Sequence, residues 1–377
     1  MTEYSEERGF RLSNAAVAVC DFPAARRRGR IAVLLILLLC RAAPAAAQKP
    51  DETSEQKSDD QDSEPVLWRD PTDIRSRNLF YGPGGTEDRP PAADFQYEKE
   101  DLKGTNPKFD VRDADGIKWR VKLGEEAKPE TVASRLLWAV GYFTNEDYFL
   151  PEIRVRGMEP VSKKRRKRVQ GLVEPDGTMY NARLKRHAPG VKKVGIWRWR
   201  QNPFLGTREL NGLRVMMAVI NNWDLTDDNN AIYAEKDRGD QKRGSDSSRV
   251  VYMVSDIGAS FGTAGRVRDR RVAKGNLDSY RRSKFMCKIN RDYVDLCVPA
   301  RESWPLAVNP KEYIRRLRLR SLGRHLPRAD AKWIGELLAR LSPEQIRDAF
   351  RAGGYSPEQA DAFSNVVAKR IAELNDL

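Results

Sequence analysis

Residues 117–141 read IKWRVKLGEEAKPETVASRLLWAVG and change from a strand pattern to a helix pattern. The first seven residues have the alternating apolar side chains of a half-buried strand. The later part has Pro129 near its start and Gly141 at its end, which is typical of a helix. We therefore predict a strand that carries Lys122, followed by a helix that carries Glu130.

The flanking sequence predicts a small β-rich lobe around this unit. Further strand patterns lie at 95–98, 108–112, 152–157 and 178–185, and the turn 113–116 (DADG) predicts a hairpin between two of the strands. We expect residues 95–190 to form an N-lobe with a sheet and one helix.

Residues 191–377 are expected to form a larger, mainly helical C-lobe. An apolar helix is predicted at 209–222 and two short strands at 231–234 and 250–254. Ser342-Pro-Glu-Gln345 and Ser356-Pro-Glu-Gln359 each have the pattern of a helix start. The predicted fold class is α+β, with two lobes.

The composition excludes several classes of protein. The chain has 377 residues and a formal charge of +14, and with 40% hydrophobic and 32% charged residues it is too polar for a multi-span membrane protein. Its aromatic content argues against complete disorder. With two histidines and four widely spaced cysteines, a multi-His metal centre and a four-cysteine zinc ribbon are excluded. The remaining chemistry rests on Asp, Asn, Lys and Glu.

The first 47 residues have the pattern of a secretory signal peptide. Arginines at 26–28 and 30 precede the apolar run 31–40, and Ala45-Ala46-Ala47 offers a cleavage site. The apolar run is too short for a permanent anchor. We expect cleavage near Ala47, a periplasmic or extracellular protein, and no transmembrane anchor after cleavage. Residues 48–66 are acidic and polar and predict a disordered linker, and 67–94 an irregular lead-in.

Cys287 and Cys297 remain after cleavage, in a compartment that permits disulfides. They flank a polar stretch that could turn a hairpin, and the sequence leaves a disulfide and two free thiols equally open.

Three polar positions follow one another at the ends of predicted elements: Asp224 after the apolar helix, Asn229 five residues later, and Asp256 before Ile257-Gly258. Phosphoryl transfer needs a strand cation with a partner carboxylate, an Asp beside the attacking hydroxyl, and an Asn and a second Asp for Mg²⁺. We assign Lys122 and Glu130 to the nucleotide, Asp224 to catalysis, and Asn229 and Asp256 to the metal. Asn230 competes with Asn229 for the metal position.

These segments resemble atypical kinase-like families. Residues 102–109 (LKGTNPKF) with 119–122 (WRVK) resemble the phosphate loop and strand lysine of the HipA-type kinases. Residues 222–230 (NWDLTDDNN) resemble the catalytic loop of those kinases and of the CotH kinases. Residues 254–262 (VSDIGASFG) resemble the metal-binding segment of the CotH and secretory-pathway casein kinases.

The resemblance covers roughly residues 95–265 and implies a bilobal protein-kinase-like fold that uses ATP and Mg²⁺. It implies that Lys122 and the 103–108 loop grip ATP. The candidate residues of that loop are Gly104, Thr105, Asn106 and Lys108. The chain departs from the protein-kinase pattern, since it has no Gly-x-Gly-x-x-Gly and no His-Arg-Asp, which leaves room for a non-catalytic member.

A basic segment between Arg154 and Arg200 suggests a second function. It holds 15 Lys/Arg against three Asp/Glu, including six consecutive cations at 163–168 and the sequence IWRWR at 196–200. Outside the cytoplasm we expect anionic lipid or glycan phosphates as its partners rather than nucleic acid. For residues 163–168 the alternative is a solvated loop between two strands, and for Trp197 and Trp199 we expect burial between the lobes rather than stacking on a ligand.

Three hypotheses follow. The first is an exported Mg·ATP-dependent phosphotransferase with an unknown acceptor, either a protein hydroxyl or a small molecule. The second is a pseudokinase or anion-binding module of the cell envelope. The third is a structural envelope protein, in which the five polar residues do not converge.

Overall fold

The computed structural model describes residues 64–90, 92–104, 106–163, 165–188, 190–235, 249–263, 273–298 and 308–377. The expected signal peptide, the linker up to residue 63, and Thr105 lie outside the described residues. Among the described helices, none has the length and apolar character needed to cross a bilayer.

Five strands close into a barrel in the order β2-β3-β4-β6-β5. They are β2 (Asp94–Glu100), β3 (Lys108–Arg112), β4 (Lys118–Leu123), β5 (Asp147–Arg156) and β6 (Thr178–Arg186). Parallel pairing of β2 with β5 closes the barrel. The predicted strands are confirmed, although β5 begins five residues before the predicted start. The barrel has its own core, which includes the fully buried Phe109, Trp119 and Val121.

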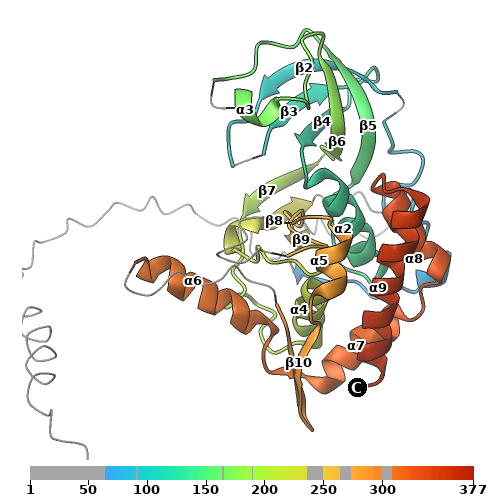
Figure 1. Cartoon of the computed structure of the whole chain (residues 1–377), viewed down its shortest axis with the longest axis vertical. Helices are drawn as coiled ribbons and strands as arrows, with labels where there is room; N and C mark the ends of the chain where they lie inside the picture. The colour runs from blue at the N-terminus through green and yellow to red at the C-terminus, as the bar shows by residue number, and fades with distance from the viewer. Residues whose placement is uncertain are drawn as a thin grey trace, which may run out of the picture. The chain divides into compact units, whose positions relative to one another are not determined.

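The helix α2 (Ala127–Ala139) follows β4 and packs against β5, β6 and α8 (Figure 1). The predicted helix is confirmed, but it begins two residues before Pro129. Gly141 follows it with φ +95°, and a Cβ at this position would lie 2.2 Å from the Arg69 carbonyl oxygen. Glycine is therefore required where the chain passes the lead-in segment.

A second sheet has the strand order β1-β9-β8-β7. Its strands are β1 (Pro65–Val66), β9 (Arg249–Val254), β8 (Asn230–Glu235) and β7 (Val191–Gly195). The boundary of the expected linker needs a correction here, because Pro65–Val66 pair in parallel with Val250 and Val251. The next residue, Leu67, is buried in the larger core. The apolar end of the linker is thus part of the folded unit.

The remaining chain is helical, with one small sheet. Its helices are α3 (Arg166–Val169), α4 (Arg208–Val219), α5 (Leu277–Arg282), α6 (Pro310–Arg320), α7 (Arg328–Leu338), α8 (Pro343–Ala352) and α9 (Pro357–Asn375), with short 3₁₀ turns η1 (Ile74–Ser76), η2 (Asp227–Asn229) and η3 (Ser321–Gly323). Figure 1 shows α8 and α9 side by side. Both predicted capping boxes are present, at Ser342 with Gln345 and at Ser356 with Gln359.

Most of the helices share one large core with α2 and the lead-in. Trp197 and Trp199 lie in it with ring centroids 4.8 Å apart, so the expectation that they are buried is confirmed. Phe261 is also fully buried there, between Tyr280, Phe350 and Phe363. This aromatic cluster fixes the segment that follows Asp256.

The third sheet consists of β10 (Met286–Ile289), β11 (Tyr293–Leu296) and β12 (Leu326–Pro327). Cys287 and Cys297 form a disulfide across the β10–β11 hairpin, with Cα atoms 5.2 Å apart. The question that the sequence left open is therefore answered in favour of the bridge.

We expect Cys287→Ser/Cys297→Ser to lower the free energy of unfolding by about 2–3 kcal/mol, because the bridge restricts the unfolded chain. Urea denaturation of the oxidised and reduced protein measures this. The reducing agent should destabilise the wild type and leave the double variant unchanged. Equal stability of the oxidised wild type and the variant would contradict the prediction.

Candidate functional site

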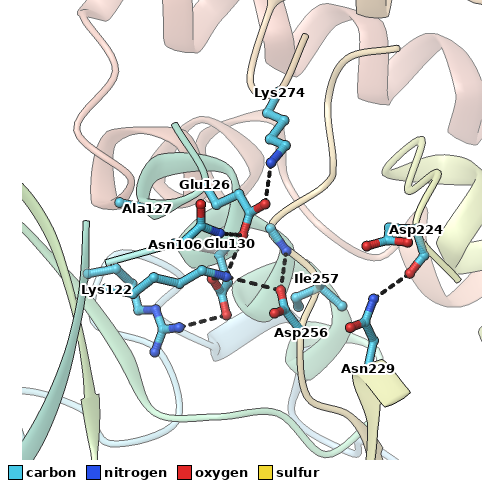
Figure 2. A network of polar contacts seen from close by, with 12 residues as sticks. Asn106, Lys122, Glu126, Ala127, Glu130, Asp224, Asn229, Asp256, Ile257 and Lys274 are labelled. Carbon is cyan, nitrogen blue, oxygen red and sulfur yellow. Dashed lines mark hydrogen bonds and ion pairs between the residues drawn. The ribbon is translucent and has the colours of Figure 1, made fainter. Parts of the chain in front are cut away.

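The Lys122 side chain, which is 1% exposed, is the centre of a buried ion network (Figure 2). Its ammonium lies 2.8 Å from Glu130 Oε2 on α2 and 3.1 Å from Asp256 Oδ1, 134 residues away in the chain. A third carboxylate, Glu126 Oε2, lies 2.6 Å away. The structure therefore brings the predicted strand lysine, its helix glutamate and the predicted metal aspartate together.

Strand register adds two cations to this network. Lys108 on β3 is the cross-strand partner of Lys122 on β4, which is in turn the partner of Arg183 on β6. Directly paired residues of neighbouring strands have side chains on the same face of the sheet, so three cations lie in a row. Arg183 contacts Glu130 Oε1 at 2.9 Å and Asp147 Oδ1 at 3.3 Å. Both oxygens of Glu130 are therefore used by cations.

Lys108 differs from the other two cations, because it has no ion pair with any described carboxylate. It is half-buried, and burial followed by the nearby Lys122 holds the pKa of its ammonium below the usual value. Like charges on paired strands are destabilising. An anion beside Lys108 and Lys122 would remove that repulsion.

The charge state of the network follows from its geometry. Burial by itself would lower the pKa of Lys122, but Glu130, Asp256 and Glu126 outweigh it and hold this pKa above its usual value. Burial by itself would raise the pKa of Asp256, but Lys122 outweighs it and holds this pKa below its usual value. Both groups are thus ionised at neutral pH.

Backbone bonds connect the two other predicted site residues to Asp256. The Asn229 carbonyl accepts hydrogen bonds from the Ser255 and Asp256 amides at 2.8 and 3.1 Å. The Asn229 side-chain amide donates to the Asp224 carbonyl at 2.6 Å, and Figure 2 shows its oxygen turned away from Asp224. Asp224 and Asp256 thus lie on either side of Asn229.

The two loops run together beyond these residues. The Phe261 amide donates to the Ile220 carbonyl at 2.8 Å, and the Trp223 amide to the Ala259 carbonyl at 3.3 Å. A Cβ on Gly258 would lie 2.7 Å from Glu126 Cβ, so the glycine lets α2 approach the Asp256 segment closely. These contacts fix the positions of both loops relative to the ion network.

Asn230, the alternative to Asn229, faces the protein interior. It is fully buried, and its side-chain amide donates to the Trp197 carbonyl at 3.0 Å. Asn229 is only half-buried and borders the Asp256 segment. The structure therefore places Asn229, and not Asn230, beside the cluster.

The predicted phosphate loop lies over the network. The Asn106 side-chain amide donates to Glu126 Oε2 at 2.5 Å. Gly104 has φ +73°, and a Cβ on it would lie 3.6 Å from the Lys108 ammonium. Thr105 lies outside the described residues. Gly104 thus lies near Lys108, which is itself the β3 cation of the loop set, and Asn106 contacts Glu126, the partner of Lys122.

Sequence reasoning missed Glu126, Asp147, Arg183 and Lys274. Glu126 pairs with Lys122 and Lys274, while Asp147 accepts a hydrogen bond from Ser134 Oγ at 3.0 Å. The signal for Arg183 was its position in the predicted strand 178–185, but the register with Lys122 is known only from the structure.

Glu126, Glu130 and Asp256 offer oxygens within 4.8 Å of one another, a spacing that could hold a metal ion. The Lys122 ammonium contacts all three carboxylates. In this arrangement Lys122 contributes positive charge to all three acids, together with Arg183 at Glu130 and Lys274 at Glu126.

A cavity of about 910 Å³ borders this network at the start of α2. Gly124, Lys128, Lys274 and Tyr355 are among its lining residues. Lys274 therefore belongs both to the cavity lining and, through its ion pair with Glu126, to the ion network.

We expect Glu130→Ala to lower the free energy of unfolding by about 3–5 kcal/mol, because Lys122 and Arg183 would lose a buried partner. Urea denaturation measures this. The matched control is Glu125→Ala, an exposed glutamate in the same segment, which should change stability by less than about 0.5 kcal/mol. Equal effects of the two changes would contradict the buried network.

The pKa of Asp256 lies below its usual value because of Lys122, so this group stabilises the fold above its unfolded pKa of about 3.9. That contribution is lost as the pH falls toward the folded pKa. Asp256→Asn should therefore destabilise the protein at pH 7, and the difference from wild type should shrink at pH 3. Urea denaturation at both pH values tests this, with exposed Asp228→Asn as the control. A difference that does not change with pH would refute the prediction.

Comparisons with known proteins found no matching family model, no matching curated protein and no matching solved structure. The argument for a function therefore rests on the chemistry of this site.

Proposed function

We propose that the protein is a kinase-like phosphotransferase that transfers a phosphoryl group from Mg·ATP to a hydroxyl of an unknown acceptor, either a protein or a small molecule. The observation that supports this proposal most directly is the pair of contacts made by the Lys122 ammonium. It lies 2.8 Å from Glu130 on α2 and 3.1 Å from Asp256 after β9. A strand cation fixed by a helix carboxylate, beside a second carboxylate, is the arrangement that phosphoryl transfer uses.

The residues present fit a nucleotide triphosphate. Lys108 and Lys122 lie side by side on paired strands, and Lys108 makes no ion pair with a carboxylate among the described residues, although Asp256 and Glu130 act on it electrostatically. Phosphate oxygens would give Lys108 an ion-pair partner. The loop with Gly104 and Asn106 lies over the same cations.

The residues also fit Mg²⁺. This ion prefers oxygen ligands and is usually held by one or two protein groups together with phosphates. Asp256 offers a carboxylate that is 38% exposed, and Asn229 offers an amide oxygen on the neighbouring segment. When bound, Mg²⁺ neutralises charge that develops on the phosphate oxygens.

In the proposed reaction the acceptor oxygen forms a bond to the γ-phosphorus, the bond from that phosphorus to the β–γ bridging oxygen breaks, and ADP leaves. Asp224 accepts the proton of the acceptor hydroxyl. Lys122, oriented by Glu130, binds phosphate oxygens, and Arg183 holds the second oxygen of Glu130. Positioning and charge would supply most of the rate enhancement.

A bilobal kinase-like fold is part of this proposal. Two observations support it. The barrel and the helical part have separate hydrophobic cores, and the ion network joins Lys122 of the barrel to Glu130 of α2 and to Asp256 after β9. Export through the N-terminal segment is proposed from the sequence pattern of residues 1–47 alone.

The second candidate is a pseudokinase or anion-binding module of the cell envelope. The observation that favours it is the exposure of Arg166, Lys167, Lys192 and Lys193 in the basic segment. Exposed cations can bind lipid or glycan phosphates without any transfer chemistry.

The two candidates differ in the behaviour of Asp224→Asn. In a phosphotransferase this change should reduce transfer of label from γ-labelled ATP, including any self-labelling, by about 10³-fold or more, while Mg·ATP binding persists. The control Asp228→Asn changes an exposed aspartate of the same loop and should keep nearly full activity. Asp256→Ala should abolish the transfer.

Equal labelling by wild type and Asp256→Ala would eliminate the mechanism. Thermal stabilisation of the wild type by polyanions but not by Mg·ATP would favour the anion-binding module instead.

A further inference from the structure

Among the described residues of the basic run at 163–168, one cation is buried. Arg165 is 2% exposed, whereas Lys163, Arg166, Lys167 and Arg168 are exposed. Burying a guanidinium is costly unless its N–H groups are hydrogen-bonded. The contacts of Arg165 therefore show what this position does.

Arg165 donates hydrogen bonds to the backbone of the predicted phosphate loop. Its Nη1 lies 2.7 Å from the Asn106 carbonyl oxygen, and its Nη2 lies 3.0, 3.3 and 3.4 Å from the carbonyl oxygens of Gly104, Lys103 and Asp101. The Arg165 guanidinium thus donates hydrogen bonds to four backbone carbonyl groups within six consecutive positions.

The direction of these carbonyl groups determines which backbone groups lie on the opposite side of the loop. In a trans peptide the C=O and N–H bonds point in opposite directions. The carbonyls of Asp101 and Lys103 share their peptides with the N–H groups of Leu102 and Gly104, so these two N–H groups are directed away from Arg165, and outward N–H groups are how backbone concavities bind anions. The peptide of the Asn106 carbonyl has no N–H to offer, because the next residue is Pro107. Gly104 lies between the two faces, since its carbonyl faces Arg165 and a Cβ on it would lie 3.6 Å from the Lys108 ammonium.

The segment that carries Arg165 is itself fixed to the barrel. The Ser162 amide and hydroxyl donate to the two carboxylate oxygens of Glu100, each at 3.0 Å. Val169 is buried in the barrel core. On the other side, Asn106 contacts Glu126 of the ion network. A continuous set of contacts thus joins the basic run to Lys122.

We propose that Arg165 is a positioning residue that holds the backbone of residues 101–104 and 106 in the shape that binds the phosphates of the nucleotide. This inference rests on the proposed function and deepens it. It assigns the buried member of the basic run to nucleotide binding, and it separates this arginine from the exposed cations around it.

Geometry, and not charge alone, is required for this role. A guanidinium has five N–H donors in a planar fork, while an ammonium is a compact group that cannot reach four carbonyls in the same way. Arg165→Lys should therefore fail to restore function, although it keeps the positive charge.

Isothermal titration of the 377-residue chain with Mg·ATP and with adenosine tests the proposal. Arg165→Ala and Arg165→Lys should both weaken Mg·ATP binding by about 10- to 100-fold, the loss expected for charge-assisted hydrogen bonds. Adenosine has no phosphate, so its affinity should change by less than about twofold. Arg166→Ala, which removes a neighbouring exposed cation, should leave both affinities unchanged.

A second variant distinguishes a loss of loop positioning from a folding defect. Glu100→Ala releases the basic run from β2 and keeps Arg165, so it should weaken Mg·ATP binding in the same direction but less. Hydrogen exchange of the 101–108 amides should become faster in both Arg165 variants.

The outcomes separate the two proposals. A wild type that binds no Mg·ATP would overturn the proposed function and, with it, the role of Arg165. A wild type that binds Mg·ATP together with an Arg165→Ala variant of equal affinity would overturn only the role of Arg165. Full rescue by lysine, or an equal loss of adenosine affinity, would show a charge effect or a general structural effect and would also overturn it.

Discussion

The site depends on one constraint, which is that the buried Lys122 ammonium needs carboxylates from distant parts of the chain. An unpaired charge in the interior is strongly unfavourable, so Lys122 can be buried only if Glu130 and Asp256 approach it. Glu130 comes from α2, and Asp256 comes from the segment after β9, the last strand of the second sheet in chain order. The ion network therefore ties the barrel to the loops that carry Asn229 and Asp224. Close packing of Gly258 against Glu126 permits this approach.

The network is balanced in charge. Its cations are Lys108, Lys122, Arg183 and Lys274, and its carboxylates are Glu126, Glu130, Asp147 and Asp256. Lys122 contacts all three acids of the possible metal cluster. If Asp256 binds a metal ion, the ion pair between Asp256 and Lys122 would therefore become weaker. Phosphate oxygens beside Lys108 and Lys122 would then replace the lost negative charge. In the proposed function, nucleotide and Mg²⁺ thus enter together for an electrostatic reason.

The basic segment shows why charge counts alone are a poor guide to function. In the sequence, 163–168 is a uniform run of cations, and a solvated loop and an anion-binding surface explain it equally well. In the structure, Arg165 is buried against backbone carbonyls and its described neighbours are exposed. The difference arises from the packing of Val169 and the bonds between Ser162 and Glu100, which join residues 62 positions apart. No local pattern in the run distinguishes Arg165 from Arg166.

The sequence by itself determined the local elements: the strand with Lys122, the helix with Glu130, the apolar helix before Asp224, and the capped helices at Ser342 and Ser356. Periodicity, proline and glycine positions and capping residues are properties of neighbouring positions, so they can be read without the fold. Only the tertiary structure decided that Lys122, Glu130 and Asp256 meet, that Arg183 and Lys108 flank Lys122, that Asn229 and not Asn230 borders Asp256, and that Cys287 pairs with Cys297. These outcomes depend on strand register and on contacts between distant segments, which the pattern within any one segment does not specify.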